Sequence, residues 1–246
     1  MKDIDLALLT GVDIPIPECQ LTLHQPTIEE ISMIGEKQFL AGAQVLCITR
    51  EELEDKTGRQ PALINTPNFK IFITIMTSNE VKDAKNAVKD ALSILVPNAT
   101  VTFTPRSLLL NYNGTNIIID EGNFEYFQNV LRRVCCLKRN VEEDYNPSND
   151  AARKIAEKMK AAHKRVARIK GDDQGSIYSR YCSSLAIGLH LPLQDFFKCT
   201  IYQLNDLLER FNLWTNWDID IRARLAGATA KGKPEDWMRN IHKDQL

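Results

Sequence analysis

Residues 107–120, SLLLNYNGTNIIID, decide the fold class of this chain. The Asn113-Gly114 pair accepts the positive φ angles of a two-residue type I′ turn, and the apolar runs on either side have the composition of strands. We therefore predict a β-hairpin near 107–120, and we expect residues 101 and 103 to belong to a third strand.

The turn also fixes the register of this hairpin. Because side chains alternate along a strand, the pairs fall on two faces, and both faces carry apolar residues. We therefore expect both faces to be covered. The predicted pairs are Leu108 with Ile119 and Leu110 with Ile117 on one face, and Leu109 with Ile118 on the other.

Helix signals lie before and after the hairpin. The first 19 residues look irregular and 20–25 form a short strand, after which Thr27-Ile-Glu-Glu30 and Thr49-Arg-Glu-Glu52 have the spacing of capping boxes. Apolar spacing predicts further helices over 39–47 and 81–95. The spacing in 69–76 fits a strand as well as a helix, and Thr66-Pro67, which resembles a helix start, favours a helix there. A helix opening at Gly122-Asn123 buries Phe124, Phe127, Leu131 and Val134 in one stripe, which leaves Arg132 and Arg133 outside.

The chain after residue 147 has only helical patterns. The acidic run and Asn-Pro break at 142–147 suggest a boundary between an α+β domain (1–141) and a helical domain (148–246). The latter is expected to begin with a long basic helix at 150–170 and to continue with helices over 177–190 and after Thr200. We expect a short helix to begin at Pro234. The fold class is therefore α+β, with an all-helical C-terminal part.

Composition excludes several classes of protein. The 246 residues are 43% hydrophobic and 26% charged, which is typical of a globular chain and not of a disordered one. The net charge of −1 argues against a uniformly basic nucleic-acid binder, but the charge is segregated. Residues 1–60 hold eleven acids and five bases, a net −6, and 150–170 hold eight bases and two acids, a net +6.

No motif in the sequence predicts catalysis, a cofactor or a metal. Residues 227–233 resemble a phosphate-binding loop, but Pro234 stands where the motif needs Ser or Thr. Asp218 and Asp220 point apart on a helix, and Cys19 with His24 lacks a second ligand pair. The six cysteines are expected to be small buried hydrophobes. We expect a non-enzymatic protein with no catalytic, cofactor or metal site.

Two surfaces are candidates for binding a partner. On the basic helix, the candidate residues are Lys154, Lys158, Arg165 and Arg168. They are suited to an acidic protein surface or to nucleic acid, and the alternative is that they form a solvated face without a partner. The acidic first 60 residues are a further candidate partner for it. After Thr200, the stripe Ile201, Leu204, Leu208 and Phe211, or the pair Trp214 and Trp217, is either a groove for a helical partner or part of the core.

The two ends of the chain resemble a known family. Ile14-Pro-Ile-Pro17 followed by Leu21-Thr-Leu-His-Gln-Pro26 and Thr27-Ile-Glu-Glu30 resembles the start of phage tail assembly chaperones and of T-even-type baseplate-hub assembly proteins. The stretch from Phe196 to Phe211 is similar to the polar-aromatic helix found late in such proteins.

This resemblance implies assembly work through protein–protein contacts. Such a protein keeps a phage structural protein of tape-measure or hub type soluble until tail or baseplate subunits assemble. A permanent virion component (tail, connector or baseplate) and a nucleic-acid-binding accessory protein that uses 150–170 are the alternatives. No segment has the roughly 18 apolar residues of a membrane span, so we expect the host cytoplasm, or the virion, as the location.

Overall fold

The N-terminal residues form a helix and a two-stranded sheet in the computed structural model, which describes residues 4–57, 65–78, 81–112, 114–137, 175–228, 232–239 and 241. After α1 (Ile4–Thr10), the strands β1 (Ile14–Ile16) and β2 (Leu21–Leu23) pair antiparallel around the 3-10 helix η1 (Pro17–Cys19). β2 confirms the strand predicted within 20–25. Residues 4–19 hold more regular structure than predicted, because Ile14 and Ile16 are buried in the core.

In the described residues five helices follow, and two of them begin at the predicted capping boxes. Thr27 and Glu30 exchange hydrogen bonds at the start of α2, and Thr49 and Glu52 do the same at the start of α4. The helices predicted over 39–47, 69–76 and 81–95 are confirmed. Their bounds are α2 (Ile28–Ile34), α3 (Glu36–Leu46), α4 (Arg50–Thr57), α5 (Asn68–Thr77) and α6 (Lys82–Leu95).

The predicted hairpin is present with the predicted register. β4 (Leu108–Tyr112) pairs with β5 (Thr115–Ile119), and β3 (Thr100–Phe103) adds the third strand in the order β3-β4-β5. One face is covered, since Leu108, Leu110 and Ile119 are buried. The expectation that both faces are covered was wrong, because Ile118 is 51% exposed on the other face.

α7 (Phe124–Val134) buries the predicted stripe and also one of its arginines. The expectation that Arg132 lies outside was wrong. Its guanidinium donates to the carbonyl oxygen of Cys47 and forms an ion pair with Glu52 at 3.2 Å. A buried arginine needs such partners, and here they are supplied by a helix end and a capping residue far away in the sequence.

The C-terminal part is helical, as predicted. α9 (Ile177–Leu189) leads through η3 (Leu193–Phe196) to α10 (Ile201–Leu225), which is capped by Thr200 and Gln203. The helix predicted from Pro234 was wrong, since residues 232–239 form turns and irregular chain. The basic segment 150–170 and the boundary at 142–147 lie outside the described residues. The division into two domains therefore stays a prediction.

One hydrophobic core joins the two ends of the chain. The buried cluster that contains Leu8, Phe39 and Leu92 also contains Leu185 and Leu204. α9 is further anchored to the N-terminal part by Glu36, whose carboxylate accepts the Ile177 N–H at 2.8 Å. A carboxylate at the start of a helix is favourable because the free N–H groups there carry partial positive charge.

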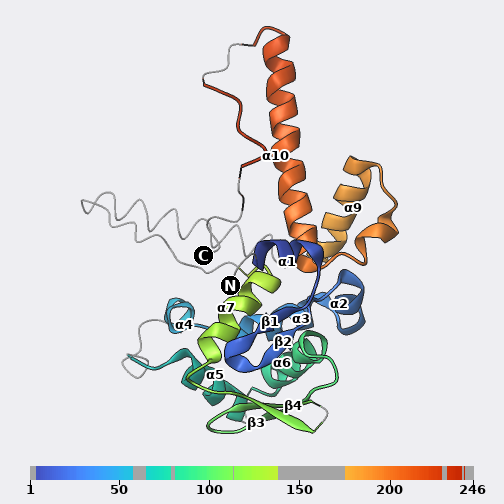
Figure 1. The fold of residues 1–246 in the computed structure, drawn as a ribbon. Helices are drawn as coiled ribbons and strands as arrows, with labels where there is room; N and C mark the ends of the chain where they lie inside the picture. The colour runs from blue at the N-terminus through green and yellow to red at the C-terminus, as the bar shows by residue number, and fades with distance from the viewer. Residues whose placement is uncertain are drawn as a thin grey trace, which may run out of the picture.

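The base of α10 meets the start of α2 in a short seam of backbone hydrogen bonds. Thr27 and Thr200 form an antiparallel β-bridge. The N–H groups of Ile28 and Ile201 donate across it to the carbonyl oxygens of Cys199 (3.0 Å) and Pro26 (3.2 Å). The seam, defined as 26–29 against 197–201, therefore fixes where α10 leaves the body of the molecule (Figure 1).

The closest helix contact, between α3 and α6, depends on Gly42. A Cβ on Gly42 would lie 2.1 Å from the carbonyl oxygen of Ala87 and 2.8 Å from the Cβ of Ala91.

Gly42→Ala should lower the free energy of unfolding by about 1–3 kcal/mol in urea denaturation, because this overpacking outweighs the gain of about 0.5–1 kcal/mol in helix propensity. Gly175→Ala, where a Cβ meets nothing within 4 Å, is the control. Equal stability of the two variants would contradict this packing.

Candidate protein-binding surface

α10 is anchored in the core only near its start. Ile201, Tyr202 and Leu204 are buried, and Leu213 is the last residue of the helix to be so. Gln203 adds a second anchor, since its side chain caps the Thr200 N–H and donates to the carbonyl oxygen of Leu9 in α1 at 2.8 Å. Figure 1 shows the rest of α10 extending away from the other helices.

α9 supports the middle of α10 through a close contact. A Cβ on Gly188 would lie 2.3 Å from Cζ of Phe211, so the ring of Phe211 rests directly on the backbone of α9. Leu208 and Phe211 are half-buried against the core cluster. The stripe Ile201, Leu204, Leu208 and Phe211 is therefore core, and only the residues after it are candidates for binding a partner.

The C-terminal segment 232–239 runs back along α10 and is held by two arginines. Arg210 donates to the carbonyl oxygens of Trp237 (3.0 Å) and Arg239 (2.8 Å), and Arg224 donates to that of Gly232 (2.9 Å). Arg224 is itself oriented by Asp220, 3.0 Å away. These contacts use backbone carbonyls, so they hold the segment in an irregular conformation whatever its helix propensity.

Beyond Leu213, α10 leaves apolar side chains exposed on two sides: Trp214 and Leu225 share one face, and Ile219, which is 59% exposed, lies about 140° away around the helix. Trp214 is 43% exposed and Leu225 is 84% exposed. At about 100° per residue they lie about 20° apart around the helix axis, three turns from each other, with Ile221 between them. Trp217 lies about 60° from Trp214, on the side where Arg210 and Arg224 hold the C-terminal segment, and it is half-buried.

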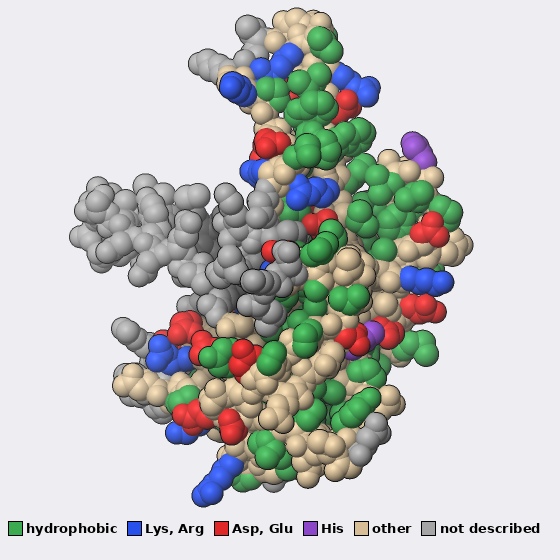
Figure 2. Space-filling view, in the orientation of Figure 1, with side chains coloured by type: hydrophobic (Ala, Val, Ile, Leu, Met, Phe, Trp, Pro, Cys, Tyr) green, Lys and Arg blue, Asp and Glu red, His purple; other side chains and the backbone are tan. Residues whose placement is uncertain are grey.

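A second group of exposed apolar side chains adjoins the base of α10. It covers the end of α9 and the η3 turn, and Figure 2 shows hydrophobic side chains gathered there and along α10. Large apolar patches on a soluble protein commonly mark interaction sites. The side chains are Ile187 (77% exposed), Leu189 (37%), Leu191 (48%), Leu193 (40%) and Phe197 (39%).

The structure describes only part of the predicted binding residues. Trp214 and Trp217 share the projecting half of α10, whereas Lys154, Lys158, Arg165 and Arg168 lie outside the described residues. The sequence did not reveal the role of Arg210 and Arg224, because their partners are backbone carbonyls, those of Trp237 and Arg239 in the predicted helix and that of Gly232 in the loop before it.

Asp218 and Asp220 do not form a carboxylate pair. Each forms an i,i+4 ion pair with an arginine, Arg222 at 2.9 Å and Arg224 at 3.0 Å. They point to different sides of α10, as expected from their spacing.

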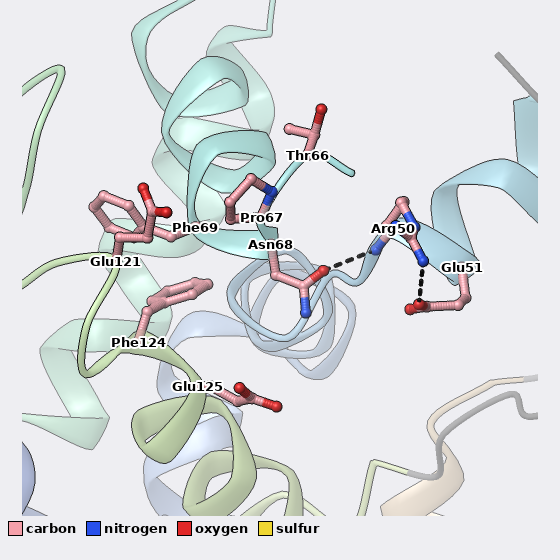
Figure 3. Close-up of a pocket in the computed structure, with 9 residues that line it drawn as sticks. All are labelled: Arg50, Glu51, Thr66, Pro67, Asn68, Phe69, Glu121, Phe124 and Glu125. Atoms are coloured by element: carbon pink, nitrogen blue, oxygen red, sulfur yellow. Dashed lines mark hydrogen bonds and ion pairs between the residues drawn. The ribbon is translucent and has the colours of Figure 1, made fainter. Parts of the chain in front are cut away.

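A shallow pocket lies between the starts of α4, α5 and α7 (Figure 3). Its charged groups are largely paired: Arg50 contacts Glu51 at 3.3 Å and its N–H donates to Asn68, and Glu121 faces Lys70 at 3.7 Å. The described lining contains no cysteine or histidine.

The buried cysteines are unsuited to chemistry. Burial raises the pKa of Cys47 to about 12 and that of Cys19 to about 11, so both stay protonated at neutral pH. Within the described part of the chain, no group of His, Cys, Asp and Glu could hold a metal ion. None of the described helices is long and apolar enough to cross a membrane.

Residues 179–242 match the family described as the YomV second domain, a phage-type family of the Bacillus phage SPbeta region. The match supports a phage origin. It covers most of α9, all of η3 and α10, and the segment held by Arg210 and Arg224, so the candidate surface lies within the matched region. No curated protein and no solved structure matches the chain.

The contact between Arg210 and the C-terminal segment can be tested by limited proteolysis. Arg210→Gln removes two charge-assisted hydrogen bonds, each worth about 1.5–3 kcal/mol, so cleavage by chymotrypsin after Trp237 should accelerate about tenfold or more. Arg222→Gln is the control, because that side chain is 76% exposed and, among the described residues, forms its ion pair with Asp218 of its own helix. Equal cleavage rates in the two variants would contradict the contact.

Proposed function

We propose that this protein is a non-enzymatic phage assembly protein that binds a phage structural protein of tape-measure or hub type. In this proposal the projecting half of α10 is the binding surface, and the partner is held soluble in the host cytoplasm until tail or baseplate subunits assemble. The phage-type match supports the setting of the proposal.

One observation carries the proposal: α10 continues for three turns beyond its last buried residue and keeps Trp214 and Leu225 exposed on one face. Exposing such side chains to water is unfavourable, and tryptophan in particular is enriched in the energetic centres of protein interfaces. An amphipathic helix of a partner can cover this face with apolar residues spaced three and four apart.

The binding surface is preorganised. The seam and the contact of α9 hold the lower half of α10 rigid, so binding to the upper half does not require the core to rearrange. The C-terminal segment borders the same face without covering Trp214.

A co-expression experiment tests the proposal. The full chain is expressed with the tape-measure-type or hub-type protein of the phage that encodes it, and the soluble yield of that protein is measured. Wild type should raise this yield, whereas Trp214→Ser with Leu225→Ser should abolish the gain, since loss of two anchors weakens binding by at least about tenfold.

The control replaces an equally exposed pair elsewhere. Tyr126 on α7 is 52% exposed and Met33 on α2 is 84% exposed, so Tyr126→Ser with Met33→Ser matches the changed apolar area. This variant should behave as wild type. Loss of the gain in both variants, or in neither, contradicts α10 as the binding surface.

The composition of mature particles separates the proposal from a permanent virion role. We expect the protein to be absent from purified virions by mass spectrometry, and deletion of its gene to lower the number of complete tails seen by electron microscopy. Its presence in virions at a fixed copy number would identify a structural component instead. Two results together would favour the nucleic-acid alternative. Deletion of the gene would leave the tails normal, and neutralising the charges of 150–170 would abolish binding to DNA or RNA.

A further inference from the structure

His24 lies between two carboxylates from different elements. Its Nδ1 is 2.9 Å from Oδ1 of Asp13, in the loop before β1, and its Nε2 is 3.1 Å from both carboxylate oxygens of Glu30 on α2. A neutral imidazole has one N–H, so only the protonated ring can donate to both carboxylates at once. The geometry is therefore that of an imidazolium.

Glu30 also carries the capping box of α2. Its Oε2 accepts the N–H and the hydroxyl of Thr27, each at 2.8 Å, and its own N–H donates to the Thr27 hydroxyl at 3.3 Å. A carboxylate that leaves His24 must also change these contacts. The state of His24 is thus coupled to the position of Thr27.

Thr27 stands in the seam that joins α2 to the base of α10. The residues beside it, Ile28 and Glu29, donate their N–H groups to the carbonyls of Cys199 (3.0 Å) and Phe197 (2.9 Å). On its other side, the backbone N–H of His24 donates to the carbonyl of Leu95 at 2.8 Å, which fixes His24 to the end of α6. The path from the imidazole to the seam is therefore short and continuous.

We propose that His24 is a proton-dependent latch for the seam: its imidazolium clamps Asp13 and Glu30 and so keeps 26–29 docked against 197–201 at the base of α10. Loss of the proton leaves one carboxylate facing a nitrogen lone pair. The hydrogen bonds across the seam then open more often. This inference concerns the attachment of α10 and does not depend on what α10 binds.

The pH range in which the latch is closed depends on the pKa values of His24 and Glu30. Partial burial alone would lower the pKa of His24, but the hydrogen bonds and charges of Asp13 and Glu30 outweigh it and raise the pKa above 6.5. A raised histidine pKa means that its stabilisation is complete below pH 6.5 and is lost as the pH rises through the folded-state pKa. The titratable groups that face the ring are Asp13 and Glu30, and α6 contributes a carbonyl.

The lower limit of this pH range is set by the pKa of Glu30. Partial burial would raise its pKa, but the bonds from Thr27 and His24 lower it below 4.5. A lowered carboxyl pKa stabilises the fold above pH 4.5, and this contribution is lost as the pH falls through the folded-state pKa. The latch is therefore closed between these limits and opens on either side.

Two measurements on the full chain test the latch. NMR titration gives the pKa of His24, whose imidazole signal is assigned by its loss in His24→Gln. Residue-resolved hydrogen exchange, corrected for intrinsic base catalysis, follows the amides of Ile28, Glu29 and Ile201 from pH 6 to pH 9. We expect a pKa above 6.5, and seam protection that falls about tenfold through it, as expected for the loss of one charge-assisted hydrogen bond.

Variants separate the latch from a general effect of pH. His24→Gln should give low, pH-independent seam protection while the amides of β4 and β5 keep theirs, which shows that the variant folds. Asp13→Asn should move the transition to lower pH, because one of the two carboxylates that raise the pKa is gone. His190→Asn, at an exposed histidine that ends α9, should match wild type.

Each outcome decides the inference. A His24 pKa above 6.5, together with seam exchange that follows it in wild type and not in His24→Gln, supports the latch. A pKa at or below 6.5 overturns it. The same exchange profile in wild type and His24→Gln also overturns it, even with a raised pKa, because the imidazolium then stabilises Asp13 and Glu30 without holding the seam.

Discussion

The rest of the structure depends on two threonines that begin helices and face each other across one β-bridge. Thr27 and Thr200 each satisfy their own helix start through a capping box, which leaves the neighbouring backbone groups free to pair across the seam. The backbone at a helix start has a defined direction. Pairing the starts of α2 and α10 across the bridge therefore fixes the directions in which both helices leave the seam. α2 turns along the body, and α10 leaves it.

This arrangement gives α10 two halves with different tasks. The lower half contributes Ile201 and Leu204 to a core that it shares with α1 and α3, and Phe211 packs on Gly188 of α9. The C-terminal segment runs beside the upper half and is held by Arg210 of the lower half and Arg224 of the upper half. The region that matches the phage-type family includes both halves, so the matched unit brings its own anchor and its own exposed face.

Local chemistry explains which elements the sequence predicts. The capping boxes at Thr27, Thr49 and Thr200 act over three residues, and Asn113-Gly114 acts over two, so each is visible in a short stretch of sequence. The sequence also singles out Trp214 and Trp217 as candidate binding residues, whereas the exposure of Leu225 and the division between core and surface at Leu213 depend on where the body of the molecule ends.

The missed features depend on contacts between distant residues. Arg132 is buried because its guanidinium pairs with Glu52 and with the carbonyl of Cys47, which lie some 80 residues earlier in the chain. No local sequence pattern predicts such a contact. β1 is three residues long with Pro15 at its centre, too short to show a period. The segment after Pro234 has a helix-start pattern, but Arg210 takes carbonyls that such a helix would use, so tertiary contacts override local propensity.

The three tryptophans of this chain, Trp214, Trp217 and Trp237, all lie on α10 or on the segment beside it, which makes them native probes of the proposed surface. The most direct test is ¹⁹F NMR of the 5-fluorotryptophan-labelled full chain, with and without the tape-measure-type or hub-type protein of its phage. The Trp214 resonance should show a solvent-isotope shift in the free protein, and should lose it and move when the partner binds. A Trp214 resonance that is already shielded from solvent, or that stays unchanged while the partner binds, would contradict the account.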